Sequence, residues 1–324
     1  MLKCFSPLLN SMKVFGLYFT QASHRIHNAS TPTSGTMDSQ VPRKWNRGRI
    51  HAVIILLVIW LNVARMLSIF HKTDKFGVTI FLKLTQISAS FLSAFQQTAC
   101  FVACQTGNLD RVFSDAILLK STVAKYHRLA IIHTFVCWVS LLAILSLFLP
   151  PVFITMDHSL HSSMTPFSVH VFITDHLLIL AKAMTSLFFT SSYCAWIFSH
   201  SVNYMVTSVL YDQFGALNKD FHHVISCRGE FQGSIREFRR RHQELSQSVQ
   251  NADQFMMVSN VAGFCCQILS IILILYCSIF FREESVGQDA TSAIMFVIWL
   301  VSTLLSLTLT ACQGIVINHV VGFA

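Results

Sequence analysis

The stretch that decides the fold is a run of apolar residues, IHAVIILLVIWLNVARMLSIF, which occupies Ile50–Phe70. A bilayer has a hydrocarbon core about 30 Å thick that offers the backbone no hydrogen-bond partner, so a chain crosses it as a helix of about 20 apolar residues. Six segments reach this length: Ile50–Phe70, Val78–Ala103, Leu129–Thr155, Phe167–His200, Gln254–Phe281 and Ser292–Asn318. The sequence therefore predicts an all-α, polytopic transmembrane bundle with six spans.

The composition agrees with a membrane protein. Of the 324 residues, 53% are apolar and only 12% are charged, and the mean hydropathy is +0.56, which excludes an ordinary soluble globular protein. The spans divide the chain into an N-terminal segment over 1–49, spans one to four within 50–200, a polar connection over 201–253, and spans five and six within 254–324.

Lysine and arginine are concentrated in alternate connections. Seventeen lie in the N-terminal segment and in the second and fourth connections, against three (Lys72, Lys75 and Arg282) in the others. Basic loops stay in the cytoplasm, so we expect a cytoplasmic N-terminus and a multi-pass protein of the plasma membrane. Met1–Phe19 lacks the apolar centre of a signal peptide. Because the basic residues follow the membrane topology, we expect no nucleic-acid partner.

No motif in the sequence indicates catalysis or metal binding. The chain has no His-Glu-x-x-His helix, no Gly-x-Ser-x-Gly turn and no glycine-rich phosphate loop. Eight of the ten cysteines fall within apolar spans, where small buried thiols are common, and none falls in a predicted external loop. We therefore expect no enzyme activity, no cofactor, no metal site and no disulfide framework.

The fourth connection has the pattern of two amphipathic helices. Apolar residues recur every three or four positions on both sides of Gly229 and Gly233, while charged residues occupy the other faces. The second stripe consists of Ile235, Phe238, His242, Leu245, Val249, Ala252 and Met256. This spacing predicts a cytoplasmic helical hairpin between spans four and five, and the alternative is a helix lying on the membrane surface.

Ionisable residues inside spans are the best pointers to function, because a charge in hydrocarbon is costly unless it is paired or hydrated. The candidates share the outer half of the bundle, and they are Arg65, Lys83, Asp175, His176 and Lys182. Together they predict a polar ligand-binding pocket open to the external side. For Arg65 and Lys83 the alternative is that the side chains extend to the lipid headgroups.

Two short runs resemble invertebrate gustatory receptors. Phe5–Gly16, FSPLLNSMKVFG, is similar to their opening, where an apolar Pro-Leu segment precedes a glycine before the first span. Arg236–Asn251, REFRRRHQELSQSVQN, followed by Phe255 and a span reaching Tyr276, resembles the basic helix that leads into their fifth span. The cytoplasmic N-terminus expected from the charges is also typical of that family.

The resemblance implies a subunit of a tetrameric, ligand-gated cation channel used for taste or related chemosensing. In that family the ligand site lies in the outer half of the bundle, and the cytoplasmic ends of the later helices anchor the subunits to one another. The five ionisable candidates and the stripe from Ile235 to Met256 lie in the matching regions. The implied partners are a small-molecule ligand, the lipid bilayer and related subunits in a homo- or hetero-tetramer.

One departure from the family is important. Gustatory receptors have seven spans, and their Thr-Tyr and Gln-Phe signature lies in the last, pore-lining one. Thr308–Asn318 has neither pair, so we expect a chain truncated before its pore helix. The alternatives are a G-protein-coupled serpentine chemoreceptor, which needs an external N-terminus, and a small-solute transporter, for which internal repeats are missing.

Overall fold

The structure is a computed structural model that describes residues 2–19, 46–68, 78–115, 123–153, 175–225, 233–280 and 290–322. This part of the chain is helical, which confirms the predicted all-α class. The elements are η1 (Leu2–Phe5), α1 (Ser6–Val14), α2 (Arg47–Ser68), α3 (Val78–Thr106), α4 (Asn108–Asp115), α5 (Val123–Phe153), α7 (Asp175–Val224), α8 (Ile235–Phe280) and α10 (Ala290–Gly322).

Four helical stretches are long and apolar enough to cross a membrane: Arg47–Ser68, Lys83–Thr106, Ala124–Ser146 and Met256–Phe280. They coincide with the first, second, third and fifth predicted spans. A shorter apolar helix, Val297–Cys312, lies in the predicted sixth span. The predicted fourth span begins outside the described residues and continues as the first half of α7. These helices indicate a membrane-embedded protein.

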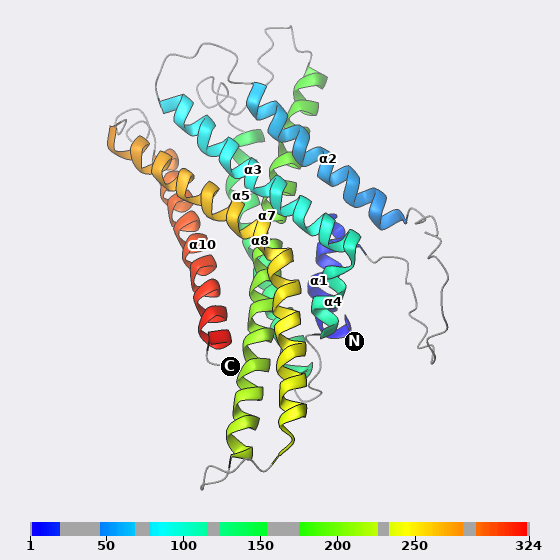
Figure 1. The fold of residues 1–324 in the computed structure, drawn as a ribbon. Helices are drawn as coiled ribbons and strands as arrows, with labels where there is room; N and C mark the ends of the chain where they lie inside the picture. The colour runs from blue at the N-terminus through cyan, green and yellow to red at the C-terminus, as the bar shows by residue number, and fades with distance from the viewer. Residues whose placement is uncertain are drawn as a thin grey trace.

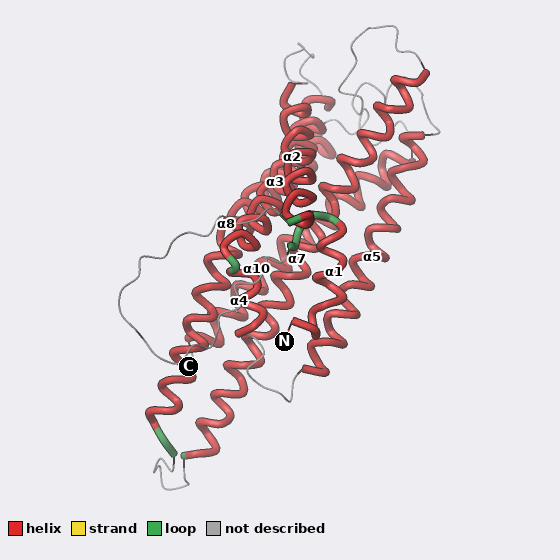
Figure 2. The backbone as a smooth tube through the Cα atoms, turned by 90° about the vertical axis from the view of Figure 1, so that its right-hand side faces the viewer, coloured by secondary structure: helices red, strands yellow, loops and turns green. Residues whose placement is uncertain are grey.

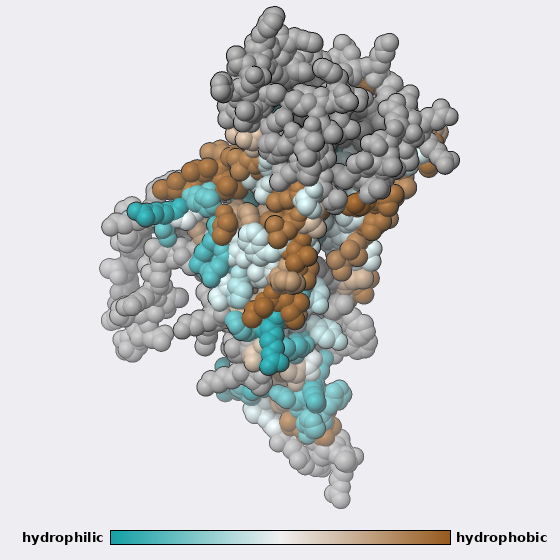
Figure 3. All heavy atoms as spheres, turned by 180° about the vertical axis from the view of Figure 1, so that it is seen from behind, coloured by the Kyte–Doolittle hydropathy of each residue, from teal (hydrophilic) through white to brown (hydrophobic). Residues whose placement is uncertain are grey.

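The surface also fits a membrane environment. Large apolar side chains such as Phe135, Ile272 and Leu305 are exposed on the outward faces of α5, α8 and α10. Figure 3 shows hydrophobic side chains along the middle of one face and hydrophilic ones gathered toward the end formed by α7 and α8. Exposed apolar faces of this kind suit a lipid environment, because lipid tails are as apolar as the side chains.

Helix α7 is the centre of the bundle and contacts α2, α3, α5, α8 and α10. Helix α3 packs along α8, and α2 lies on α3 (Figures 1 and 2). The 50 residues of α7 correspond to about 75 Å of helix, far more than the bilayer core requires. Its second half and the first half of α8 therefore continue beyond the apolar helices as an antiparallel pair (Figure 1).

Residues 2–19 form part of the core, which the sequence did not lead us to expect. The side chains of Phe5, Leu8, Met12 and Leu17 are fully buried. The Phe5 ring lies 4.7 Å from that of Phe113 on α4, measured between ring centres. The N-terminal segment, defined here as residues 2–19, is thus an integral part of the bundle.

Gly16 has a left-handed backbone conformation and turns the N-terminal segment after α1. Its φ is +67°, its N–H donates to the Lys13 carbonyl (3.2 Å), and the Leu17 N–H donates to the Met12 carbonyl (2.9 Å). These two bonds form the usual glycine stop of an α-helix. The Gly16 carbonyl then accepts a buried hydrogen bond from the Gln97 side chain on α3 (2.9 Å), which fixes the turn against the bundle.

Candidate functional site

The five predicted ligand-site residues come from three helices. Arg65 lies near the C-terminal end of α2 and Lys83 in the first half of α3, so the two meet the bundle at the same end (Figure 1). Asp175, His176 and Lys182 lie in the first turns of α7, but their side chains are outside the described residues. The geometry of the site is therefore built on Arg65 and Lys83.

Arg65 is a buried cation that contacts α7. Its side chain is only 7% exposed, and its Nη1 donates to the Thr185 hydroxyl at 3.4 Å. The guanidinium carbon lies 5.0 Å from the centre of the Phe188 ring, within cation–π range. Within the described part of the chain, the buried Nε has no hydrogen-bond partner. The guanidinium is thus enclosed by protein and only partly satisfied.

Lys83 is equally buried, with 7% exposure. It lies seven positions before Ser90 on α3, so the two share one side of the helix. The Ser90 hydroxyl accepts a hydrogen bond from the Asn62 amide on α2 at 3.4 Å, and Asn62 lies three positions before Arg65. Two basic side chains, on α2 and α3, are therefore buried inside the bundle. We call Arg65, Thr185, Phe188, Asn62 and Lys83 the outer polar site.

Hydroxyl, amide and imidazole groups also connect the helices deeper in the bundle. Ser88 on α3 accepts a hydrogen bond from Ser270 on α8 at 3.2 Å. Gln267, also on α8, donates to the Ser306 hydroxyl on α10 at 2.6 Å, and that hydroxyl lies 3.0 Å from His200 Nε2 on α7. We call these five residues the polar ladder. Such bonds hold apolar helices together where lipid offers no alternative partner.

Sequence reasoning missed the polar ladder. The serines and the glutamine of the ladder carry no charge, so a search for ionisable residues passes over them, and His200 lies at the end of the predicted fourth span, away from the ionisable candidates. The signal that could have found them is a small polar residue on an otherwise apolar helix face. Ser88 and Ser270 are such residues in the second and fifth predicted spans.

The antiparallel pair of α7 and α8 has its own small core. Leu245 on α8 is buried against Phe214 and Leu217 of α7. The Phe238 ring packs edge-to-face on Phe221, with 5.7 Å between ring centres. The apolar stripe of α8 therefore meets the apolar face of α7 in the same chain.

The other residues of the α8 stripe differ in burial according to their position along the helix. His242 packs edge-to-face on a ring of α7 at 6.2 Å, and Val249 is partly buried beside the small core. Ala252 and Met256 are buried in the main core, whereas Ile235, at the start of α8, is 66% exposed. Six of the seven predicted anchor residues thus pack inside the molecule to some degree.

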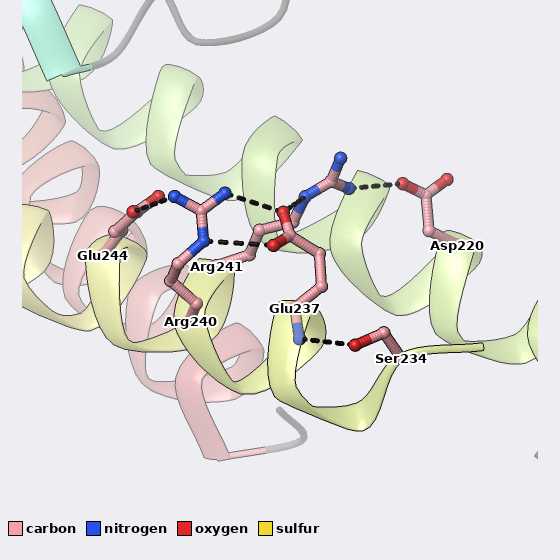
Figure 4. Close-up of polar contacts among 6 residues, drawn as sticks. All are labelled: Asp220, Ser234, Glu237, Arg240, Arg241 and Glu244. Atoms are coloured by element: carbon pink, nitrogen blue, oxygen red, sulfur yellow. Dashed lines mark hydrogen bonds and ion pairs between the residues drawn. The ribbon is translucent and has the colours of Figure 1, made fainter.

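Charged side chains link the same two helices near the tip of the pair (Figure 4). Arg241 lies 3.3 Å from Asp220 of α7 and 3.4 Å from Glu237. Arg240 donates two hydrogen bonds to Glu237 and contacts Glu244 at 3.2 Å. The hydrogen bonds from Arg240 hold the pKa of Glu237 below its ordinary value. These five residues form the charge cluster of the pair.

The described residues also bear on metal binding and on the groups that the outer polar site offers. Within the described ranges, no group of three His, Cys, Asp or Glu side chains is placed to hold a metal ion. What the outer polar site provides is a fixed guanidinium, an aromatic ring and amide and hydroxyl groups among apolar helices.

Comparisons with known proteins find no match for this chain. No protein-family model matches, no curated protein is significantly similar, and no solved structure matches. The site is therefore interpreted from its own geometry and chemistry.

Proposed function

We propose that the chain is a gustatory-type chemosensory receptor subunit of a ligand-gated cation channel in the plasma membrane. In this proposal six spans cross the bilayer, the N-terminus and the α7–α8 pair are cytoplasmic, and the outer polar site faces the external side. The observation that carries the proposal is the buried, partly satisfied guanidinium of Arg65. A bundle built only for structure has little reason to keep an ionisable group at such a position.

Ligand binding would act by stabilising one packing of the helices over another. A ligand shifts such an equilibrium only through different affinities for the two states. Arg65 on α2 touches α7 directly, and α7 continues into the pair with α8. A change in how α2 and α7 pack at the outer polar site would therefore tilt the helix that carries the cytoplasmic pair. Related subunits, in a homo- or hetero-tetramer, would complete the conducting pathway.

The test is to co-express the chain with a related full-length receptor subunit and to record currents evoked by a panel of sugars, amino acids, bitter compounds and organic acids. We expect a ligand-evoked current that depends on this chain. Thr185→Val and Arg65→Gln should reduce it, because both remove the link between α2 and α7.

The matched control is Arg128→Gln, which changes an exposed arginine on α5 outside the outer polar site. This variant should respond as the unchanged chain does. If the chain reaches the cell surface with its partner and no compound evokes a current that depends on it, the proposal is wrong.

A further inference from the structure

The guanidinium of Arg65 is only partly hydrogen-bonded. Its Nη1 donates to Thr185, while the buried Nε has no hydrogen-bond partner in the described part of the chain. Nε and the neighbouring Nη2 form the edge of the guanidinium on which two N–H bonds point in parallel. That edge matches the two oxygens of a carboxylate or phosphate, and such paired, charge-assisted bonds are the strong ones.

Within the described residues, this edge has no counter-ion, because no carboxylate there pairs with Arg65. Asp175 is the nearest acidic position on α7, but it lies ten residues, about 15 Å of helix, from Thr185. Because a buried cation is costly without an anion, an anion supplied from outside the chain would stabilise this site.

The neighbouring groups define the rest of the ligand. Phe188 is 3% exposed and packs over the guanidinium, and the helices around it are apolar. A small inorganic anion would have to leave water entirely to reach the guanidinium among these apolar helices, whereas an anion with an apolar body partitions into such surroundings.

We propose that the Nε–Nη2 edge of Arg65 binds the anionic head of an amphipathic molecule, a carboxylate or phosphate attached to an apolar body. Two sources share this chemistry: a free amphipathic acid and the headgroup of a membrane lipid. The inference rests on the proposed function only for its claim that occupancy matters to signalling, because the binding itself is independent of any current.

The test measures binding of radiolabelled dodecanoate, and of uncharged dodecanol, to the purified full chain in phosphatidylcholine nanodiscs, with empty nanodiscs as background. Dodecanoate should bind more tightly than dodecanol by about ten- to hundredfold, the range expected for hydrogen bonds to a charged group. Arg65→Gln should abolish this preference. Arg65→Lys, which keeps the charge but loses the paired edge, should reduce it in part.

A control variant keeps the test decisive. Arg128→Gln, which changes an exposed residue of α5 outside the outer polar site, should leave the preference for dodecanoate unchanged. If Arg65→Gln does not fold, the comparison of Arg65→Lys with the unchanged chain decides the matter alone.

Adding phosphatidylglycerol to the nanodiscs separates the two sources. Competition with dodecanoate, together with more lipid retained by the unchanged chain than by Arg65→Lys, would identify a lipid headgroup. Absence of competition would identify a free acid. Equal binding of dodecanoate and dodecanol, or the same preference in Arg65→Lys as in the unchanged chain, would overturn the inference.

The two proposals fail separately. Anion binding that depends on Arg65, in a chain that supports no evoked current, would contradict the receptor function and leave the anion site in place. Ligand-evoked currents that are lost in Thr185→Val, in a chain that binds dodecanoate and dodecanol equally, would support the receptor function and contradict the anion site.

Discussion

Gly16 shows how much of the fold depends on a single backbone conformation. Its positive φ sends the chain back into the bundle after α1, and its missing side chain leaves room for α2. A Cβ at this position would lie 3.1 Å from the Ala52 Cα and from the Ile55 Cβ. A side chain at this position is therefore disfavoured twice, by the positive φ and by the closeness of α2.

Gly16→Ala should therefore destabilise the protein. The left-handed conformation costs a residue with a side chain about 1–2 kcal/mol, and the close approach to α2 adds to that cost. The measurement is the midpoint of thermal unfolding in detergent, which should fall. Gly215→Ala in α7 is the control, because no atom lies within 4 Å of the added Cβ and φ there is not positive.

The control has an expected change of opposite sign. Alanine is favoured over glycine within a helix by about 0.5–1 kcal/mol, so Gly215→Ala should raise the midpoint slightly. A Gly16→Ala protein as stable as the unchanged chain would mean that the turn at Gly16 is not as described.

At the scale of the element, α8 combines two surroundings in one helix. Its N-terminal part packs on α7 through Leu245 and the charge cluster, and the part from Ala252 onward joins the main core. The two parts should therefore differ in their response to substitution.

Leu245→Ala removes the centre of the small core between α7 and α8. Loss of a buried leucine costs about 2–5 kcal/mol, so hydrogen exchange of the α8 amides around it should become much faster. Ile235→Ala changes an exposed residue of the same stripe and should alter stability by less than about 0.5 kcal/mol. Equal effects of the two substitutions would contradict the packing of the pair.

The charge cluster predicts a dependence on pH with a definite sign. The pKa of Glu237 is lowered in the folded protein, so its ion pairs with Arg240 and Arg241 stabilise the start of α8 above its ordinary pKa and are lost as the pH falls through the folded value. Exchange of the first α8 amides, corrected for the intrinsic rate, should therefore increase on acidification.

Glu237→Gln should remove part of this dependence, and high salt should weaken it in the unchanged chain, because the groups are exposed. Glu244→Gln is the matched control, since Glu244 makes a single contact with Arg240, and its effect should be smaller. An identical pH response in Glu237→Gln would show that this carboxylate does not stabilise the start of α8.

The elements differ in how far the sequence predicted them. Four long apolar runs were enough to locate helices that can cross a membrane, because lipid restricts backbone structure so strongly. The 3,4 spacing located Leu245, Ala252 and Met256, which are buried. It did not predict that Ile235 is exposed, since spacing alone does not show where a facing helix ends.

The N-terminal segment could not be placed from its sequence. Ser6–Val14 has only nine residues, with Pro7 near its start and Leu8, Leu9 and Met12 on one side. Such a short amphipathic helix fits a protein surface or a membrane surface as well as a core. Its contacts with α3, α4 and α5 are far apart in the sequence, so local pattern carries no information about them.

At the scale of the whole molecule, orientation in the membrane is the prediction on which the proposed function depends. Ser246 is exposed on the α7–α8 pair, and we expect it to face the cytoplasm. In a Cys227→Ser background, Ser246→Cys should react with a membrane-impermeant maleimide only after the cells are permeabilised. Ser248→Cys, at a buried position, should react in neither case.

Labelling of Ser246→Cys in intact cells would reverse the orientation. The outer polar site would then face the cytoplasm, and the serpentine receptor, which needs an external N-terminus, would become the better proposal.

The burial of residues 2–19 has a consequence for biosynthesis. The ribosome makes these residues before α5 and α7, yet the Trp138 and Phe198 rings that enclose Phe15 belong to those two helices. The apolar side chains of the segment must therefore remain unburied, or be shielded by a chaperone or the translocation machinery, until Phe198 has been translated. The segment is thus made early and packed late.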